Sequence, residues 1–353
     1  MLDGCRIGLV LLSAIGDVVH ALPLVASIRA AAPGARIEWV VQPVPAEIAR
    51  AHPAVDRTWV LDRRRGWRGF REFRRQVRDQ DFDLVLVLQA YTKASLATLF
   101  LRSPRKIGFD RARARELSWL ATNERIPGRP LQHVCEQYLE FADHLGAQRR
   151  YEWALPLTEE ERVDQGRFYD GLDRPLAALV PGTSRPVKEW PAERWAGLAD
   201  GLYGLGYSPC ILGGGGARER ALAGRIVELA RNPVRDLLRD DLRRLLWILD
   251  GAALAVSCDT GPYHLAVALG VPAIGLYGVT DPARVGPNRR CLDLLVDAFH
   301  EPGEPWHPVS EAMRAGRMER IGVGQAMDSV ALARARYPRA ALGPARAPAP
   351  ESA

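Results

Sequence analysis

The sequence predicts an α/β protein made of two doubly wound parallel-sheet domains in tandem. The chain has 353 residues, which is enough for two cores of ordinary domain size. Short apolar runs alternate with segments of helical apolar spacing, and this alternation stops in the middle of the chain and then restarts. Alternating strands and helices are typical of parallel sheets with helices on both faces.

The first half supplies the first expected domain, residues 1–150. Strands are expected at 6–12, 37–41, 58–61 and 84–88, each followed by a segment with helical spacing of its apolar residues. A helix at 134–145 closes this half. Residues 148–158 are polar and end in Leu-Pro-Leu-Thr, which indicates a linker.

The second half supplies the second expected domain, residues 151–336. Its predicted strands are 176–180, 209–212, 253–257 and 272–277, and its predicted helices are 191–205, 217–230, 242–249, 263–269 and 320–336. Whether the last helix packs on its own domain or back on the first is left open. Residues 337–353 are rich in Ala and Pro and have too little apolar mass to pack, so we expect a disordered tail.

Composition favours a protein of the reducing cytoplasm. No stretch approaches the roughly 20 apolar residues of a membrane-spanning helix. The apolar run at 7–15 behind Arg6 could imitate a secretion signal, but Gly16 and Asp17 end it abruptly, which favours a first strand, turn and helix. The five cysteines are odd in number and form no C-x-x-C pair, so neither a disulfide framework nor a zinc site is expected.

The net charge of +6 is concentrated in two stretches. Eight arginines lie between Arg63 and Arg78 against the single acid Glu72, and Trp67, Phe70 and Phe73 are interleaved with them. A second basic stretch contains Arg102, Arg105, Lys106, Arg111, Arg113 and Arg115. These stretches predict an anionic partner, with phosphate, anionic lipid and nucleic acid as candidates; a solvated helix face is the alternative.

The turn after the first predicted strand reads Ser13-Ala14-Ile15-Gly16-Asp17. Its small residues let the backbone approach a ligand, and Asp17 is either a helix cap or a reactive carboxylate. The G-x-G-x-x-G pattern is absent from this turn, which disfavours a nicotinamide-dependent oxidoreductase.

A strand-to-helix turn at 180–191 collects groups that suit a diphosphate. Thr183 and Ser184 provide hydroxyls, Lys188 provides a charge and the turn provides backbone N–H groups. A plain loop with a capping hydroxyl is the alternative. The glycine-rich turn at 213–216 precedes Glu219, which could accept from ribose hydroxyls; a simple tight turn explains the glycines equally well.

The stretch at 256–266 is the most informative. A strand delivers Asp259, and Thr260 and Gly261 open a helix whose free N–H groups form an anion site. His264 follows one turn later. The Asp-to-His spacing of five could indicate a metal pair, but no third ligand lies nearby, so no metal is expected. The D-x-D sequence at 81–83 precedes a buried strand and is expected to be a solvated turn.

Together these motifs resemble glycosyltransferase family 9, which contains the lipopolysaccharide heptosyltransferases. The resemblance rests on Leu-Leu-Ser-Ala-Ile-Gly-Asp at 11–17, Pro-Gly-Thr at 181–183 with Lys-Glu-Trp-Pro at 188–191, the S-x-D-T-G-x-x-H-x-A-x-A-L-G-x-P pattern at 257–272, and Tyr-Gly-Val-Thr-Asp-Pro at 277–282. It spans nearly the whole chain. It implies the GT-B fold, in which two Rossmann-like domains face a cleft, the first binding the acceptor and the second the nucleotide sugar.

The resemblance also implies roles for single residues. Asp17 would be the general base of an inverting transfer, and Lys188 would stabilise the leaving group. Donor contacts are expected from Thr183, Ser184, Lys188, Glu219, Asp259, Thr260, Gly261 and His264. Acceptor contacts are expected from Ser13, Gly16, Arg63, Arg64, Lys93 and Arg115.

The implied reaction moves a heptose from ADP-heptose to the phosphorylated, anionic inner core of lipopolysaccharide. It needs no cofactor or metal, and its place is the cytoplasmic face of the inner membrane, where the enzyme would be peripheral. Nucleic acid is not an expected partner, because no recognised nucleic-acid motif accompanies the charge.

Departures from the family pattern leave the acceptor open. They are Leu-Gln-Ala-Tyr-Thr-Lys at 88–93 in place of D-x-Q-G before the lysine, and an extra proline-rich loop at 298–317. The alternatives are another nucleotide sugar or acceptor, and a non-catalytic scaffold that binds a nucleotide sugar.

Overall fold

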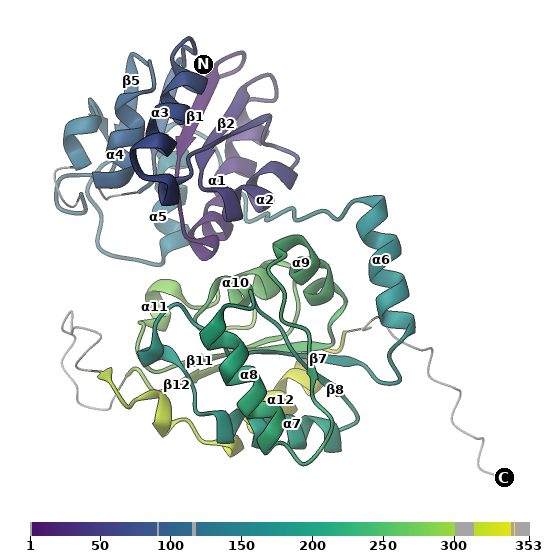
Figure 1. Cartoon of the computed structure of the whole chain (residues 1–353). Helices are drawn as coiled ribbons and strands as arrows, with labels where there is room; N and C mark the ends of the chain where they lie inside the picture. The colour runs from purple at the N-terminus through teal and green to yellow at the C-terminus, as the bar shows by residue number, and fades with distance from the viewer. Residues whose placement is uncertain (1, 90–91, 115–117, 301–313, 340–341, 343–353) are drawn as a thin grey trace. The chain divides into compact units, whose positions relative to one another are not determined.

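The computed structural model describes residues 2–89, 92–114, 118–300, 314–339 and 342. The chain forms two compact units, Met1–Pro156 and Leu157–Ala353. Each unit is built around one six-stranded parallel sheet (Figure 1). The α/β class with two doubly wound sheets, predicted from the alternating pattern, is therefore confirmed.

The first unit has the strand order β3-β2-β1-β4-β5-β6. α1 packs against α2 and α5, while α3 and α4 bury their apolar residues on the other face of the sheet. Its strands are β1 (Arg6–Val10), β2 (Arg36–Val41), β3 (Arg57–Val60), β4 (Leu84–Val87), β5 (Arg105–Gly108) and β6 (Glu124–Arg125). Its helices are α1 (Ile15–Ala31), α2 (Pro43–Ala51), α3 (Gly66–Val77), α4 (Thr92–Leu99) and α5 (Val134–His144), with 3₁₀ turns η1 (Arg63–Arg65) and η2 (Ser118–Ala121).

The second unit has the strand order β12-β11-β10-β7-β8-β9. α7 packs on α8 and α12, whereas α9 packs on α6 and α10. Its strands are β7 (Leu176–Val180), β8 (Ser208–Ile211), β9 (Arg235–Asp236), β10 (Leu254–Cys258), β11 (Ala273–Tyr277) and β12 (Leu295–Asp297). Its helices are α6 (Glu159–Asp170), α7 (Ala192–Gly204), α8 (Ala217–Leu229), α9 (Leu242–Gly251), α10 (Gly261–Ala268), α11 (Pro282–Val285) and α12 (Val323–Arg336), with 3₁₀ turns η3 (Pro186–Lys188) and η5 (Met318–Arg320).

The two sheets share one topology. Numbered within its own unit, each runs 3-2-1-4-5-6, so the strand order reverses between the first and fourth strands. In open α/β sheets, ligands bind beyond the carboxyl ends of the strands at this reversal. The turns after β1 and β4 in the first unit, and after β7 and β10 in the second, are therefore the places where functional residues are expected.

The predicted apolar strands are all present, with ends shifted by no more than two residues. The prediction missed α6, α11, β5, β6, β9 and β12, which have short or polar sequences. The final helix, α12, packs against α7, β11 and β12 of its own unit. The predicted disorder of 337–353 and most of the loop at 298–317 concern residues outside the described ranges.

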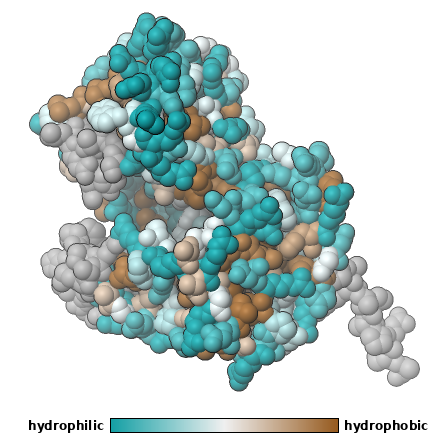
Figure 2. Space-filling model, viewed as in Figure 1, coloured by the Kyte–Doolittle hydropathy of each residue, from teal (hydrophilic) through white to brown (hydrophobic). Residues whose placement is uncertain are grey.

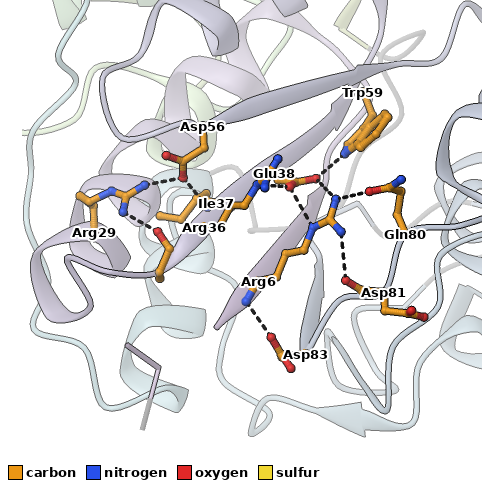
Figure 3. Close-up of polar contacts among 11 residues, drawn as sticks. Arg6, Arg29, Arg36, Ile37, Glu38, Asp56, Trp59, Gln80, Asp81 and Asp83 are labelled. Atoms are coloured by element: carbon orange, nitrogen blue, oxygen red, sulfur yellow. Dashed lines mark hydrogen bonds and ion pairs between the residues drawn. The ribbon is translucent and has the colours of Figure 1, made fainter. Parts of the chain in front are cut away.

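A buried carboxylate ties together the amino ends of the first sheet (Figure 3). Glu38 of β2 has no solvent exposure and accepts hydrogen bonds from Arg6 Nε at 2.9 Å and from Trp59 Nε1 at 2.7 Å. Arg36 Nε lies 2.7 Å from the same carboxylate. Because a buried charge is costly without partners, this cluster explains how an acid occupies a position inside the sheet.

None of the helices in the described residues is both long and apolar enough to cross a membrane. Within the same residues, no group of three or more His, Cys, Asp or Glu side chains is placed to hold a metal ion.

Candidate functional site

Asp259 is the centre of a polar cluster beyond the strand ends of the second sheet. It follows β10, and its Oδ2 accepts hydrogen bonds from Lys188 Nζ at 2.7 Å and from Thr280 Oγ1 at 2.8 Å. Its Oδ1 lies 3.2 Å from His264 Nε2. Lys188 comes from the turn after β7 and Thr280 from the turn after β11, so the fold joins residues from three strand ends and from α10.

The environment keeps the Asp259 carboxylate ionised. Burial alone would raise its pKa, but the hydrogen bond and charge of His264 and the charge and hydrogen bond of Lys188 outweigh burial and hold the pKa of Asp259 well below its usual range. The side chains of Lys188 and Asp259 are only 13% and 11% exposed. Since its lone pairs are engaged and its charge would repel a phosphate, Asp259 is suited to positioning Lys188 and His264.

The loop that carries Lys188 is anchored by a buried tryptophan. Trp190 is 1% exposed, packs edge-on against Trp195 and donates from Nε1 to the Ile321 carbonyl at 2.8 Å. This explains the tryptophan two residues after Lys188. The Thr183 hydroxyl donates to the Arg185 carbonyl at 2.6 Å, and Ser184 is exposed at the tip.

α10 begins directly beside the cluster. Thr260 is its N-cap, whose Oγ1 accepts from the Tyr263 N–H at 3.5 Å and lies 3.0 Å from Ser257 Oγ. Gly261 is the first residue of the helix and is partly exposed. The first N–H groups of a helix carry partial positive charge, so this end complements Lys188 in attracting an anion.

The glycine-rich turn after β8 encloses the carboxylate of Glu219. Its oxygens accept from the N–H groups of Gly215 at 2.9 Å and Gly214 at 3.3 Å. A Cβ atom at Gly213 would lie 1.9 Å from Glu219 Oε1, and one at Gly182 would lie 2.2 Å from it. A side chain at either glycine would displace this carboxylate, which lies against the turns after β7 and β8.

In the first unit, Asp17 lies in the first turn of α1. Its Oδ2 accepts from the Ala14 N–H at 2.7 Å and so caps the helix, and its side chain is partly exposed. The structure thus shows the capping role that the sequence allowed. Capping leaves the carboxylate able to take a proton as well, because the two roles use different lone pairs.

Gln89, just after β4, holds the turn that carries Asp17. Its Oε1 accepts from the Leu12 N–H and its Nε2 donates to the Ser13 carbonyl, both at 3.1 Å. The amide therefore bridges the first and fourth strands of the sheet at the reversal of strand order. Sequence reasoning missed this role, although a glutamine directly after a buried strand was visible.

The predicted acceptor residues are only partly brought together by the described structure. Ser13 and Gly16 share the turn with Asp17, and Arg63 and Arg64 lie in η1 beyond the end of β3. Arg64 Nε is 3.5 Å from Asp62 Oδ1. Arg115 and the side chain of Lys93 lie outside what the structure describes.

Two further residues were not predicted. Thr280 donates to Asp259, and its place in Tyr-Gly-Val-Thr-Asp-Pro was the available signal. Arg218 Nε lies 2.7 Å from Glu189 Oε1 and its guanidinium also donates to the Thr183 carbonyl, which fixes the loop before Lys188.

Comparison with known proteins matches the chain to one family. The model of glycosyltransferase family 9 (heptosyltransferase) matches residues 70–298. Lipopolysaccharide heptosyltransferase 1 of Pseudomonas aeruginosa is 33% identical over 299 residues, 81% of this chain and 82% of that protein. The lipopolysaccharide core heptosyltransferase OpsX of Haemophilus influenzae is 29% identical over 293 residues, 82% of this chain and 83% of that protein.

Solved structures give the same result. The Escherichia coli heptosyltransferase WaaC with ADP superimposes with a TM-score of 0.69 at 30% identity, over 80% of this chain and 90% of that one. A family 9 glycosyltransferase from Veillonella parvula has a TM-score of 0.82 at 23% identity, over 94% and 98%, and supports the fold. Because the family model covers more than half of the chain and a relative of 33% identity is matched over most of its length, the chain belongs to glycosyltransferase family 9.

Proposed function

We propose that this glycosyltransferase moves a heptose from ADP-heptose to the inner core of lipopolysaccharide, with inversion at the anomeric carbon. The observation that carries the proposal is that relatives about 30% identical over four-fifths of the chain are lipopolysaccharide heptosyltransferases. The Lys188 ammonium group and the N–H groups at the start of α10 add physical support, because an ADP leaving group needs positive charge near its diphosphate.

The donor is assigned to the second unit. WaaC has been solved with ADP and with ADP-2-deoxy-2-fluoro heptose. In this chain the diphosphate would lie against the α10 N-terminus, where Thr260 and Gly261 present N–H groups. The hydroxyls of Thr183 and Ser184 are within the same set of turns. We assign Glu219, at the glycine-rich turn, to the ribose hydroxyls.

Lys188 would neutralise the charge that develops on ADP as the bond from the anomeric carbon to the phosphate oxygen breaks. Asp259 holds this ammonium group and the His264 ring in place before the donor binds. With these groups supplying the positive charge, the proposed reaction uses no metal and no cofactor. Equal rates with and without a chelator would support that part of the proposal.

The acceptor is assigned to the first unit, with Asp17 as general base. An acceptor hydroxyl oxygen attacks the anomeric carbon, its proton passes to the Asp17 carboxylate and ADP leaves. The acceptor is a phosphorylated, anionic glycolipid, which the enzyme would meet at the cytoplasmic face of the inner membrane. Its contacts are assigned to Ser13, Gly16, Arg63, Arg64, Lys93 and Arg115.

ADP release from ADP-heptose, with and without a deacylated phosphorylated inner-core acceptor, tests the proposal. Asp17→Asn is the matched variant, because an amide oxygen can still accept from the Ala14 N–H but cannot take a proton at neutral pH. We expect acceptor-dependent release in the native protein, loss of release in the variant and unchanged donor binding in both.

Other outcomes separate the alternatives. Release from a different nucleotide sugar would replace the donor assignment while keeping the enzyme class. Donor binding without release from any nucleotide sugar would favour the non-catalytic scaffold. Full activity of Asp17→Asn would refute the base assignment.

A further inference from the structure

The outer face of α3 is an arginine stripe that the proposed reaction does not use. The buried face of α3 is formed by Gly69, Phe73 and Val77, which are spaced four residues apart. With about 100° of rotation per residue, one tryptophan and five arginines lie on the opposite side within roughly a third of the circumference. All are exposed, and they are Trp67, Arg68, Arg71, Arg74, Arg75 and the C-cap residue Arg78.

Most of the arginines in this stripe have no acidic partner among the residues that the structure describes. The one acid of the helix, Glu72, is paired with Arg65 of η1, and Arg78 is paired with Asp79 at 2.9 Å. For the remaining stripe arginines, the described part of the chain provides no acidic partner; these are Arg68, Arg71, Arg74 and Arg75. Figure 2 shows hydrophilic residues gathered over this side of the first unit.

The second basic stretch of the same unit is different. Arg102 pairs with Asp81 at 2.9 Å, and Arg105 pairs with Glu124 at 3.0 Å. Arg113 pairs with Asp110 and lies 2.8 Å from the buried Glu140. The charges of these arginines are therefore paired within the first unit, whereas Arg68, Arg71, Arg74 and Arg75 of α3 are left for an external anion.

An apolar ridge adjoins the stripe. Trp67 is 75% exposed, its ring lies 6.0 Å from that of Phe70, and Phe70 lies 6.4 Å from Phe100. Leu99, at the end of α4, is 60% exposed. A tryptophan beside arginines on a straight helix face suits the boundary between lipid headgroups and acyl chains, where the indole ring is enriched.

We propose that this stripe docks the enzyme on an anionic phospholipid surface through Trp67 and four of its arginines, Arg68, Arg71, Arg74 and Arg75. Anionic headgroups match its charge, and Trp67 with Leu99 supplies apolar contacts that a nucleic acid backbone or free phosphate would not use. The inference deepens the proposed function, since it names the surface that would bring the first unit to a glycolipid acceptor.

Vesicle co-sedimentation of the full chain tests the surface. The vesicles contain equal parts phosphatidylglycerol and phosphatidylcholine, with pure phosphatidylcholine as reference. The main variant is Arg71→Gln with Arg75→Gln, and its control is Arg50→Gln with Arg167→Gln, two exposed arginines on other helices that change the charge equally. Trp67→Ala tests the apolar part separately.

We expect the native protein to bind the anionic vesicles and not the neutral ones. Each lost arginine should weaken binding about fivefold, so the α3 double variant should lose about 25-fold while the control stays within about twofold. Trp67→Ala should also weaken binding. Turnover of the deacylated, water-soluble acceptor should be unchanged in all variants, because none of these side chains belongs to the donor or base site.

Equal loss in the α3 variant and the control would overturn the proposal, as would equal binding to neutral vesicles. Loss of turnover on the soluble acceptor would also overturn it, because α3 would then belong to the saccharide site. Binding of DNA with no binding of vesicles would assign the stripe to nucleic acid instead. Failure of the proposed heptosyl transfer would appear as absent ADP release in the native protein, whatever the vesicles show.

Discussion

A double-mutant cycle on Lys188 and Asp259 tests whether these two charges are strongly coupled in the proposed donor site before any donor binds. The single changes are Asp259→Asn, which leaves the lysine without its anion, and Lys188→Met, which leaves the carboxylate with His264 and Thr280. Both variants keep the side-chain size nearly constant. The double variant removes both charges together.

The magnitude follows from burial. With side chains only 13% and 11% exposed, water screens the pair weakly. Removing one partner of such a pair costs about 3 kcal/mol or more, because an uncompensated charge stays buried. We expect about 3 kcal/mol for Asp259→Asn, less for Lys188→Met, and a double variant no worse than the single aspartate change. The coupling free energy would then be about 2 kcal/mol.

Urea unfolding measures these changes, with hydrogen exchange in β7 and β10 assigning the transition to the second unit. The surface pair of Arg225 and Glu228, which are 50% and 69% exposed at 2.8 Å, serves as control and should show coupling below about 1 kcal/mol. Additivity within about 0.5 kcal/mol for the buried pair would refute the reasoning.

The ion pair of Lys188 and Asp259 also predicts how their coupling free energy depends on pH. The pKa of Asp259 is depressed in the folded state, so its stabilising contribution is present above the ordinary carboxylate pKa of 3.8 and is lost as the pH falls below that value. The coupling should therefore be constant from neutral pH down to about pH 5. A coupling that disappears between pH 7 and 5 would contradict the assignment of the charge to this carboxylate.

Three further changes have defined outcomes. Glu38→Gln removes the buried carboxylate that pairs with both Arg6 and Arg36 at the amino ends of the first sheet, and should lower the free energy of unfolding by about 2 to 3 kcal/mol in urea. Burial lowers the pKa of His52 to about 4 from 6.5, so stability should fall as the pH drops from 6.5 towards 4, by about 2 kcal/mol at pH 5; His52→Asn should flatten this dependence in unfolding curves at several pH values. Gln89→Met removes both hydrogen bonds that hold the turn carrying Asp17, and should lower kcat about tenfold with an unchanged KM for the donor, whereas an equal change in both constants would assign Gln89 to binding.

The sequence predicted the strands whose apolar runs reach four residues or more, because burial on both faces leaves a continuous signal. β6 and β9 have two residues each, Glu124–Arg125 and Arg235–Asp236, and such polar edge pairs carry no periodicity. α6 buries only Gln165 and Tyr169, so its apolar spacing is weak. Its available signal was the capping box of Thr158 and Glu161.

The candidate site, too, could be predicted only in part from local sequence patterns. Asp259, Thr260 and His264 are neighbours in sequence, so one motif located them. The partners of Asp259 lie 71 and 21 residues away at Lys188 and Thr280. Their convergence depends on β7, β10 and β11 lying side by side in one sheet, which local sequence does not encode. The hydrogen bonds of Gln89 to the turn after β1 likewise depend on β1 and β4 lying side by side in one sheet.

Because Asp259 already balances the charge of Lys188, the proposed donor site has little net attraction for small inorganic anions. Free phosphate or chloride would be attracted only weakly there. A diphosphate ester would also accept hydrogen bonds from helix N–H groups and from hydroxyls at several strand ends. The Asp259 carboxylate thus disfavours small free anions. The affinity for the donor should therefore depend less on ionic strength than it would at a site whose lysine has no carboxylate partner.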